Sequence, residues 1–378
     1  MKRIAFYAPI KPPDHPIPSG DRLIAGNLMQ ALTLAGYDAR LASRFITYSK
    51  RENSEILTKR KEEALMEAKR IIQRMRGNPP DLWLTYHPYC KAPDWIGPTV
   101  SGAFAIPYVT VEAARTGQGL ENGGDRWKAW RDEAQVGIRQ ADLHICLKPL
   151  DRFYLGGLLG SEENLRDLRP FFDATEPSNL PEISLPSHWR KDVPVLVVAG
   201  MMRPGKKVEN YRILAEALTN MQALPWNLVI IGGGPEEDAI RELFKNIATE
   251  RLYWTRSIPR EEVLAYMAQG DLFVWPGWRE PIGMVYLEAQ LMGLPVAALN
   301  DMGVPLVVKH GKTGLLAEDK GKPYEDALTT LISHPQLRHD LARQARENAI
   351  SNHGMDAAAQ RLKSLLDPLL FGKPLPNV

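Results

Sequence analysis

The sequence predicts an α/β protein built from two doubly wound domains with parallel sheets. One observation is the length of 378 residues, since a domain takes about 100–200 residues. A second is that the expected strands are apolar along their whole length, as in parallel strands buried on both faces. A third is the alternation of such strands with helices of 3.6-residue apolar period, which is typical of doubly wound folds.

The first domain opens with a strand, a proline-rich loop and a helix. Residues 4–8 form a continuous apolar run, and residues 22–35 carry apolar side chains at helical spacing. Gly36 ends this helix, as glycine often does, and a second strand follows at 38–42. The resulting βαβ unit requires a parallel sheet. Further strands are expected at 81–86, 106–111 and 142–147, with a helix at 127–140.

Residues 173–194 are rich in Pro, Ser and Glu and lack an apolar period, which predicts a linker between the two domains. The strands and helices of the second domain alternate again. We therefore expect an N-terminal domain at 1–185, a C-terminal domain at 186–355 and a closing helical segment at 356–378. Strands are expected at 193–199, 228–231, 272–275, 296–299 and 314–317, and helices at 208–221, 236–247, 260–269, 324–333, 336–352 and 357–370.

Composition excludes several classes of protein. The formal net charge of +2 is too small for an obligate nucleic-acid binder. The two cysteines, Cys90 and Cys146, form neither a CxxC pair nor a disulfide framework, which fits a reducing compartment. The apolar run after Met1 is too short for a signal peptide, and no stretch reaches the ~20 apolar residues of a membrane span. We expect a cytoplasmic protein without a bound metal, since the histidines show no zinc-ligand spacing.

Residues 50–76 are a basic amphipathic stretch, with nine Lys or Arg and five Glu. It predicts a solvated helix with one face on the core. The alternative is a surface for an anionic lipid or acceptor, with the protein held at the inner face of the membrane.

The most informative segment is 277–289, which follows an expected strand and enters a helix near residue 283. Ligands of open α/β sheets bind beyond the carboxyl ends of the strands. Free amides at the start of this helix, Gly283 to Val285 with Met284 between them, attract an anion. Glu280 precedes the helix and Glu288 lies inside it, so an elongated ligand with a central phosphate and hydroxyls at both ends would fit. The alternative is that Glu280 caps the helix and Glu288 is solvated.

Other strand ends supply weaker candidates. Arg203 and Lys206 lie in a loop where they could neutralise a diphosphate or serve as ordinary surface charges. The run Gly232 to Gly234 allows close approach of a ligand to the backbone, although no Walker or dinucleotide motif is present. In the first domain, Gly20 lies in the first loop. His87 and Glu112 each follow a strand, and either could be structural.

At these residues the sequence resembles the GT-B glycosyltransferases, specifically the retaining family four. The match consists of the E-x7-E motif at Glu280 and Glu288, its flanks at 275–276 and 289–296, and neighbouring segments within 190–350. The resemblance implies two Rossmann-like domains facing a central cleft, and transfer of a hexose from a nucleotide diphosphate sugar to an acceptor hydroxyl. It assigns Glu280 to the hexose, Glu288 to the ribose and Ile258 to the base. It assigns Lys206, Gly283, Met284 and the first-domain Gly20 to donor binding, and the segment from about 357 to packing on the first domain.

The sequence also departs from the family pattern. Met201 stands where the family has an arginine, and Arg203 is a shifted replacement. Glu112 stands where the family often has a histidine, and His87 has no firm counterpart, so both are candidates for the acceptor side. The alternatives are a GT-B epimerase or phosphorylase, and a non-catalytic partner that binds sugar nucleotides. The acceptor could be a glycan, a lipid-linked molecule or a small molecule.

Overall fold

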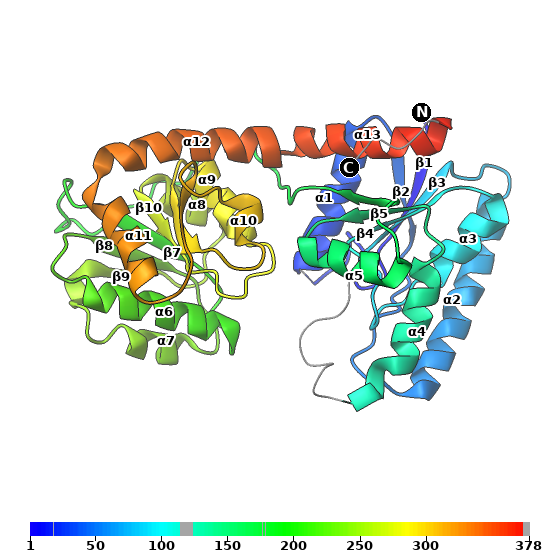
Figure 1. The fold of residues 1–378 in the computed structure, drawn as a ribbon, viewed down its shortest axis with the longest axis horizontal. Coiled ribbons are helices and arrows are strands. Elements are labelled where there is room, and N and C mark those ends of the chain that lie inside the picture. Colours follow the sequence, from blue (N-terminus) through cyan, green and yellow to red (C-terminus); the bar gives the residue numbers. More distant parts are fainter. Residues whose placement is uncertain (18, 114–123, 176, 178, 373–378) are drawn as a thin grey trace. The chain divides into compact units, whose positions relative to one another are not determined.

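The computed structural model describes residues 1–17, 19–113, 124–175, 177 and 179–372. It divides into two units, the first comprising Met1–Arg169 with Met355–Val378 and the second Pro170–Gly354. Each unit is built on a sheet of six parallel strands, so the predicted fold class, α/β with two doubly wound domains, is confirmed. Each unit is described separately below (Figure 1).

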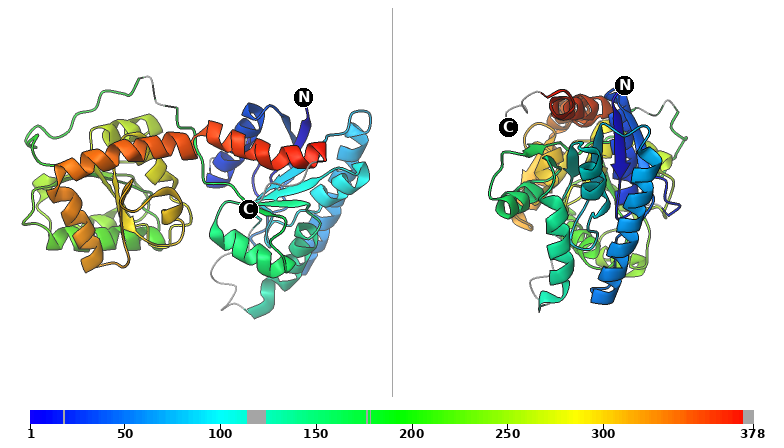
Figure 2. Two further views of the ribbon diagram at one scale, coloured as in Figure 1. Left: turned by 45° about the horizontal axis from the view of Figure 1, so that its top comes forward. Right: turned by 90° about the vertical axis from the view of Figure 1, so that its right-hand side faces the viewer.

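Unit 1 has the strand order β2-β1-β3-β4-β5-β6. One face of its sheet presents Tyr7, Trp83 and Tyr108 to a core that is shared with α2, α3 and α4. Helices α1 and α13 lie against each other (Figure 2). The elements are β1 (Arg3–Tyr7), α1 (Gly20–Leu34), β2 (Asp38–Ser43), α2 (Ser54–Met75), β3 (Leu82–Tyr86), α3 (Ile96–Phe104), β4 (Tyr108–Val111), η1 (Gly124–Trp127), α4 (Lys128–Ile138), β5 (Leu143–Cys146), α5 (Pro149–Leu159), β6 (Leu165–Asp167) and α13 (Met355–Phe371).

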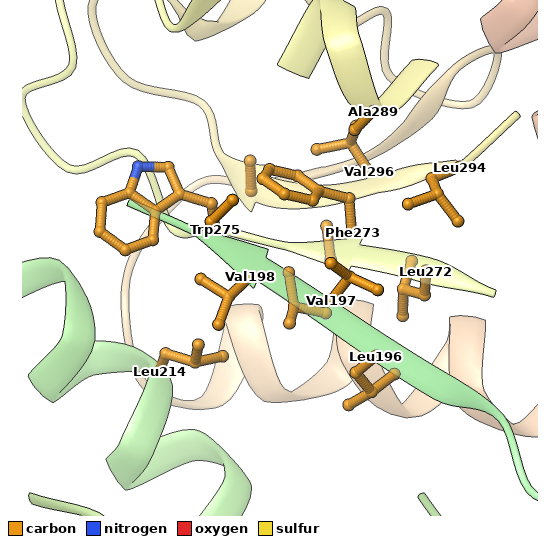
Figure 3. Packing of buried hydrophobic residues seen from close by; sticks show 14 of the residues in the cluster. Leu196, Val197, Val198, Leu214, Leu272, Phe273, Trp275, Ala289, Leu294 and Val296 are labelled. Atoms are coloured by element: carbon orange, nitrogen blue, oxygen red, sulfur yellow. The ribbon is translucent and has the colours of Figure 1, made fainter. Parts of the chain in front are cut away.

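Unit 2 has the strand order β12-β11-β10-β7-β8-β9. Its central strand carries Leu196, Val197 and Val198, all fully buried against neighbouring strands and helices (Figure 3). The elements are β7 (Val195–Ala199), α6 (Lys206–Asn220), β8 (Asn227–Ile231), α7 (Glu237–Leu243), η2 (Thr249–Arg251), β9 (Leu252–Trp254), α8 (Arg260–Ala268), β10 (Leu272–Val274), α9 (Met284–Leu291), β11 (Val296–Leu299), α10 (Val304–Val307), β12 (Gly314–Ala317), α11 (Lys322–Ser333) and α12 (Pro335–His353).

The first unit ends at Arg169, earlier than the expected residue 185. The reason is that the following segment packs on unit 2. The amide of Phe172 donates a hydrogen bond to the carbonyl of His353 at 3.0 Å, and Phe172 lies in the core of unit 2. The return of α13 to unit 1 is fixed by a hydrogen bond from the Tyr37 hydroxyl to Asp367 at 2.7 Å.

Strand register brings several loops together at the carboxyl edge of each sheet. In unit 1, Tyr86 pairs with Val111, so His87 and Glu112 are the first residues beyond two aligned strand ends. In unit 2, Ala199 pairs with Ile231, so the loops after β7 and β8 leave the sheet side by side. Side chains that are far apart in sequence therefore meet at the carboxyl edge of each sheet.

Candidate functional site

The segment that joins β10 to α9 ends in a left-handed glycine. Gly283, with φ of 73°, immediately precedes α9, and a Cβ at this position would lie 2.5 Å from the ring of Tyr286. The amide of Tyr286 donates to the Gly283 carbonyl at 3.0 Å. The amides of Met284 and Val285 come before this bond, so they have no acceptor within the helix. This end of α9 therefore presents open N–H donors and the positive end of the helix dipole.

Glu280 lies directly before this helix end and is held by two side chains. Its Oε2 accepts a hydrogen bond from Lys207 Nζ at 2.8 Å and a longer one from Trp275 Nε1 at 3.4 Å. The Lys207 ammonium also lies 5.1 Å from the centre of the Trp275 ring, in a cation–π contact. Trp275 is fully buried in the core of unit 2 (Figure 3), and the ring of Tyr211 meets its ring edge-on with centres 5.0 Å apart. Glu280 is thus a partly buried carboxylate of fixed orientation.

Asn210 joins the helix that carries Lys207 to the loop that carries Glu280. Its Nδ2 donates to the carbonyls of Lys206 at 2.8 Å and Trp278 at 3.0 Å, and its Oδ1 accepts from the Trp278 amide at 2.7 Å. Asn210 is 1% exposed, so these bonds also satisfy an amide that would otherwise be costly to bury.

The structure places both expected cations on the surface and brings a different lysine into the site. Arg203 and Lys206 are exposed, whereas Lys207 contacts Glu280. Sequence reasoning did not select Lys207. Helical geometry alone showed that the two lysines point in different directions, because consecutive side chains of α6 are turned by about 100° from each other around the helix axis.

The second acid of the motif has a cationic neighbour of its own. Glu288, on α9, accepts a hydrogen bond from Arg260 Nε at 2.7 Å, and both side chains are partly exposed. Arg260 begins α8, and Ile258 lies two residues earlier, half-buried against the core of unit 2. The residues expected at the ribose and the base, Glu288 and Ile258, are therefore linked by one ion pair and a short turn.

The glycine loop after β8 packs against the loop after β7. Gly234 has φ of 155°, and a Cβ there would lie 2.3 Å from the Met202 carbonyl oxygen. The Met202 amide donates to the Gly233 carbonyl at 3.0 Å. Gly232 is half-buried and Gly234 exposed. This close contact between the two loops by itself requires glycine at position 234, in addition to any role of the glycines in letting a ligand approach the backbone.

A second group of polar residues lies at the carboxyl edge of unit 1, and we name it the unit 1 charge cluster: Asp21, His87, Glu112, Lys148 and Asp151. Asp21 lies in the first turn of α1, next to the exposed Gly20. Its Oδ1 is 3.0 Å from His87 Nδ1. Lys148 forms an ion pair with Glu112 and lies 3.8 Å from Asp151 Oδ1. The structure thus brings together the two predicted residues, His87 and Glu112, and adds three that the sequence analysis did not place with them.

Two members of the cluster have strained backbones. His87 and Glu112 have φ of 57° and 54°, in the left-handed region that side-chain-bearing residues rarely adopt. Each is held by its neighbouring strand, because the His87 amide donates to Val111 and the Glu112 amide to Ile145, both at 2.8 Å. Strain of this kind persists where surrounding structure enforces it and is concentrated at functional sites.

The cluster also shifts the pKa values of its members. The hydrogen bond to His87 lowers the pKa of Asp21. Burial by itself would lower the pKa of His87, but the charges of Glu112 and Asp21 outweigh burial and raise it. Burial would raise the pKa of Glu112, yet the charges of His87 and Lys148 hold it below its usual range. Burial raises the pKa of Asp151 to about 6. Such opposed shifts are typical of functional sites, although structural ion-pair networks produce them too.

Neither a metal cluster nor a membrane-spanning helix is found in the part of the chain that the structure describes. Over these residues no three His, Cys, Asp or Glu side chains gather closely enough to ligate a metal ion. The same described ranges contain no helix with the length and apolar character needed to cross a bilayer.

The basic stretch forms α2, and most of its apolar side chains face the core, whereas Met66 is 50% exposed. Leu57, Ala64, Ala68 and Ile71 are buried. Some of the cations are already engaged: Lys61 pairs with Glu133 at 2.8 Å.

Comparison with known structures defines the class of fold. The structure matches a glycosyltransferase from Rickettsia africae with a TM-score of 0.72 and 13% identity, over 98% of this chain and 99% of the other. It matches sucrose-phosphate synthase from Thermosynechococcus elongatus with a TM-score of 0.68 and 16% identity, over 99% and 100%. The two doubly wound units with these neighbours define a GT-B fold.

Sequence comparison matches part of the chain to a family. Residues 181–348 match the family model described as glycosyl transferases group 1. A D-inositol 3-phosphate glycosyltransferase of Corynebacterium efficiens is 31% identical over 199 residues, 51% of this chain and 46% of that protein. A GDP-mannose-dependent phosphatidylinositol monomannoside mannosyltransferase of Mycolicibacterium smegmatis is 30% identical over 187 residues, 46% and 48%. The chain thus spans about half the length of these relatives.

Proposed function

We propose that the protein is a glycosyltransferase that moves a hexose from a UDP- or GDP-sugar to an acceptor hydroxyl, with retention at the anomeric carbon. One observation carries the proposal: the Glu280 carboxylate is fixed by Lys207 and Trp275 directly before the open amide end of α9, and Glu288 follows on the same helix. This arrangement suits a ligand with an anionic middle and hydroxyls at both ends, which is the order of groups in a nucleotide sugar.

The chemistry required is stabilisation of the leaving diphosphate. Negative charge develops on its oxygen as the bond to the anomeric carbon breaks. The amides of Met284 and Val285, the α9 dipole and the Lys207 ammonium are preorganised to meet that charge. Arg203, in the loop before α6, and Lys206, the first residue of α6, are further cations nearby in the chain. Glu280 orients the hexose hydroxyls and Glu288 those of the ribose. These protein cations allow the reaction to be independent of metal, and the leaving oxygen takes the acceptor proton on the same face of the sugar.

The relatives support the donor class. The mycobacterial relative is named for its use of GDP-mannose, and an Anabaena protein of the same fold, with a TM-score of 0.64 and 18% identity, was crystallised with UDP. We extend to this chain the class of donor, a nucleotide diphosphate sugar, and leave the base to the measurement below.

Unit 1 is proposed to serve the acceptor, with His87 and Glu112 as its contacts. An acceptor in an anionic membrane would be met by α2 through its exposed cations, such as Lys59 and Lys69, because most of its apolar side chains face the core. Flotation with vesicles containing anionic lipid tests this contact. Loss of association in a Lys59→Glu, Lys69→Glu variant is expected, and no association of the unaltered protein would count against it.

The central test is a thermal-shift panel of UDP-, GDP- and ADP-sugars, followed by detection of sugar transfer with the donor that binds. A ligand that binds the folded form raises its melting temperature. Glu280→Gln is expected to lower turnover by about 10²-fold or more, whereas the exposed Glu347→Gln on α12 is expected to leave it unchanged. An epimerase would release free UDP and an epimerised sugar without acceptor. A non-catalytic partner would bind the donor without turnover, and Glu280→Gln would leave its phenotype unchanged. Either result would overturn the proposal.

A further inference from the structure

The residue directly before Glu280 has a strained backbone. Arg279 has φ of 54°, in the left-handed region that side-chain-bearing residues rarely adopt. Its side chain is exposed, with the guanidinium 4.6 Å from the centre of the Trp278 ring. A left-handed conformation costs free energy, so it persists only where the surrounding structure enforces it. The question is which contact holds Arg279 in this conformation.

Asp301 supplies that contact. It is the second residue after β11 and lies 22 positions from Arg279 along the chain. Its Oδ2 accepts a hydrogen bond from the Arg279 amide at 2.7 Å. Asp301 is itself fixed, because its carbonyl accepts from the Val304 amide at 3.0 Å. A bond between an amide and a carboxylate is stronger than one between neutral groups, so it offsets the cost of the strained backbone.

The loop that carries Asp301 also holds the carbonyl of Glu280. The Gly303 amide donates to this carbonyl at 3.1 Å. The two segments lie so close that a Cβ on Gly303 would be 1.8 Å from the Pro281 carbonyl oxygen, which requires glycine at position 303. Glu280 is therefore bracketed by one loop, which binds the amide of the residue before it and its own carbonyl.

This bracket determines the direction of the Glu280 carboxylate. The backbone angles of Arg279 set the orientation of the residue that follows it. If Arg279 relaxed to negative φ, Glu280 would turn, and its carboxylate would lose the bonds that it accepts from Lys207 at 2.8 Å and Trp275 at 3.4 Å. The orientation of Glu280 thus depends on an aspartate that does not contact its side chain through any bond in the described part of the chain.

We infer that Asp301 is a positioning residue for Glu280, acting through the Arg279 amide. The hexose-binding role of Glu280 rests on the proposed function, whereas its orientation by Asp301 does not. The bond from Arg279 needs only an acceptor oxygen. Asp301→Asn keeps such an oxygen and Asp301→Ala removes it, so the two variants are expected to differ.

The indole N–H signal of Trp275 reports the position of the Glu280 carboxylate without any ligand. A proton–nitrogen correlation spectrum of the full chain shows this signal, and Trp275→Phe assigns it by its disappearance. We expect Asp301→Ala to shift the signal in the same direction as Glu280→Ala, which removes the indole's acceptor. Asp301→Asn is expected to leave the signal close to its position in the unaltered protein.

Asp319 offers a matched control on the neighbouring strand. It is the second residue after β12, as Asp301 is after β11, and Leu299 and Ala317 at the ends of these strands are paired. Asp319 is exposed, and its Oδ1 also accepts from a backbone amide, that of Lys320 at 2.7 Å. Asp319→Ala removes the same charge and the same kind of bond, and it is expected to leave the Trp275 signal unchanged.

Substitutions of Arg279 test the route of the effect. Glycine adopts positive φ readily, so Arg279→Gly combined with Asp301→Ala should return the Trp275 signal toward its original position. Valine resists positive φ, so Arg279→Val should disturb the signal although Asp301 is intact. The melting temperature of each variant separates local rearrangement from unfolding, and Arg279→Val carries the test if Asp301→Ala does not fold.

Turnover is expected to follow the Trp275 signal. With the donor found in the thermal-shift panel, Asp301→Ala should lower kcat by about 10–100-fold, the loss that follows from a small displacement of a group at the reacting centre. Its affinity for UDP or GDP should remain almost unchanged, because Glu280 is assigned to the hexose rather than to the nucleotide. Asp301→Asn should retain most of the turnover.

Three results would overturn the inference: Asp301→Ala leaves the Trp275 signal where Asp319→Ala leaves it, Asp301→Asn disturbs the signal as much as Asp301→Ala, or Arg279→Gly brings no recovery. If the signal behaves as expected but the unaltered protein transfers no sugar, the proposed function fails and the positioning of Glu280 by Asp301 stands. If transfer occurs and Asp301→Ala does not lower kcat, the proposed function stands and the inference fails.

Discussion

Replacing Lys207 with alanine, and Lys206 with alanine as its control, tests which lysine serves the α9 site. The two residues are adjacent, identical in chemistry and on the same first turn of α6. Their environments differ. Lys207 is 28% exposed and lies 2.8 Å from Glu280, which is 17% exposed, whereas Lys206 is exposed to solvent.

The size of the effect follows from this geometry. An exposed ion pair contributes up to about 1 kcal/mol, and removal of one partner of a fully buried pair costs about 3–5 kcal/mol. The Lys207–Glu280 pair is partly buried, so we expect Lys207→Ala to lower the free energy of unfolding by about 1–2 kcal/mol. Lys206→Ala is expected to change it by less than about 0.5 kcal/mol, as is usual at the surface.

The effect on turnover is expected to be larger than the effect on stability. Loss of one preorganised group that stabilises developing negative charge reduces kcat by about 10²–10³-fold, or about 3–4 kcal/mol. Steady-state kinetics with the donor found in the thermal-shift panel would measure both variants, and a Glu280→Gln, Lys207→Ala double variant would measure their coupling. A larger loss in Lys206→Ala than in Lys207→Ala would refute the reasoning, because it would show that the ligand recruits the exposed lysine.

Three further predictions concern titration and backbone conformation. Asp21→Asn removes a charge that raises the pKa of His87, so that pKa should fall and the imidazole should lose its proton at lower pH in an NMR titration; an unchanged pKa would contradict the assigned contact. His144 is buried, and burial lowers its pKa from 6.5 to about 4. The unfolded chain therefore binds the extra proton between these values, and stability should fall by up to about 3 kcal/mol as pH drops from 6.5 to 4. His144→Gln should reduce that slope in denaturant titrations at several pH values, and an unaltered slope would count against this origin. Gly283→Ala and Gly293→Ala both place a side chain at positive φ, 73° and 79°, but only the first meets a neighbouring ring at 2.5 Å, the second facing open space. We expect about 1 kcal/mol of destabilisation at Gly293 and at least about 2 kcal/mol at Gly283; equal melting temperatures would refute the clash.

Some elements could not be read from the sequence for physical reasons. The strands β6 and β9 lie at sheet edges and have three residues each, which is too few for an apolar pattern to be recognised in the sequence. Helix α5 contains Gly156 and Gly157, and α3 contains Pro98, all unfavourable within helices. Their formation depends on packing against the sheet rather than on local preference.

The sequence by itself determined the features that depend on neighbours along the chain. Apolar runs and helical periods located the long strands and helices, and the 277–289 segment placed Glu280 before α9 and Glu288 within it. These follow from residue spacing, because side-chain direction in a helix or strand repeats over a few residues.

Only the tertiary structure decided which distant side chains meet. Strand order and register bring Asp21 to His87 across 66 positions and Lys207 to Glu280 across 73. The choice of Lys207 over its neighbour depends on how α6 is rotated against the β10–α9 loop, which the Asn210 hydrogen bonds fix. No local pattern encodes that rotation, since it is set by packing between segments that are adjacent in the folded unit and remote in the chain.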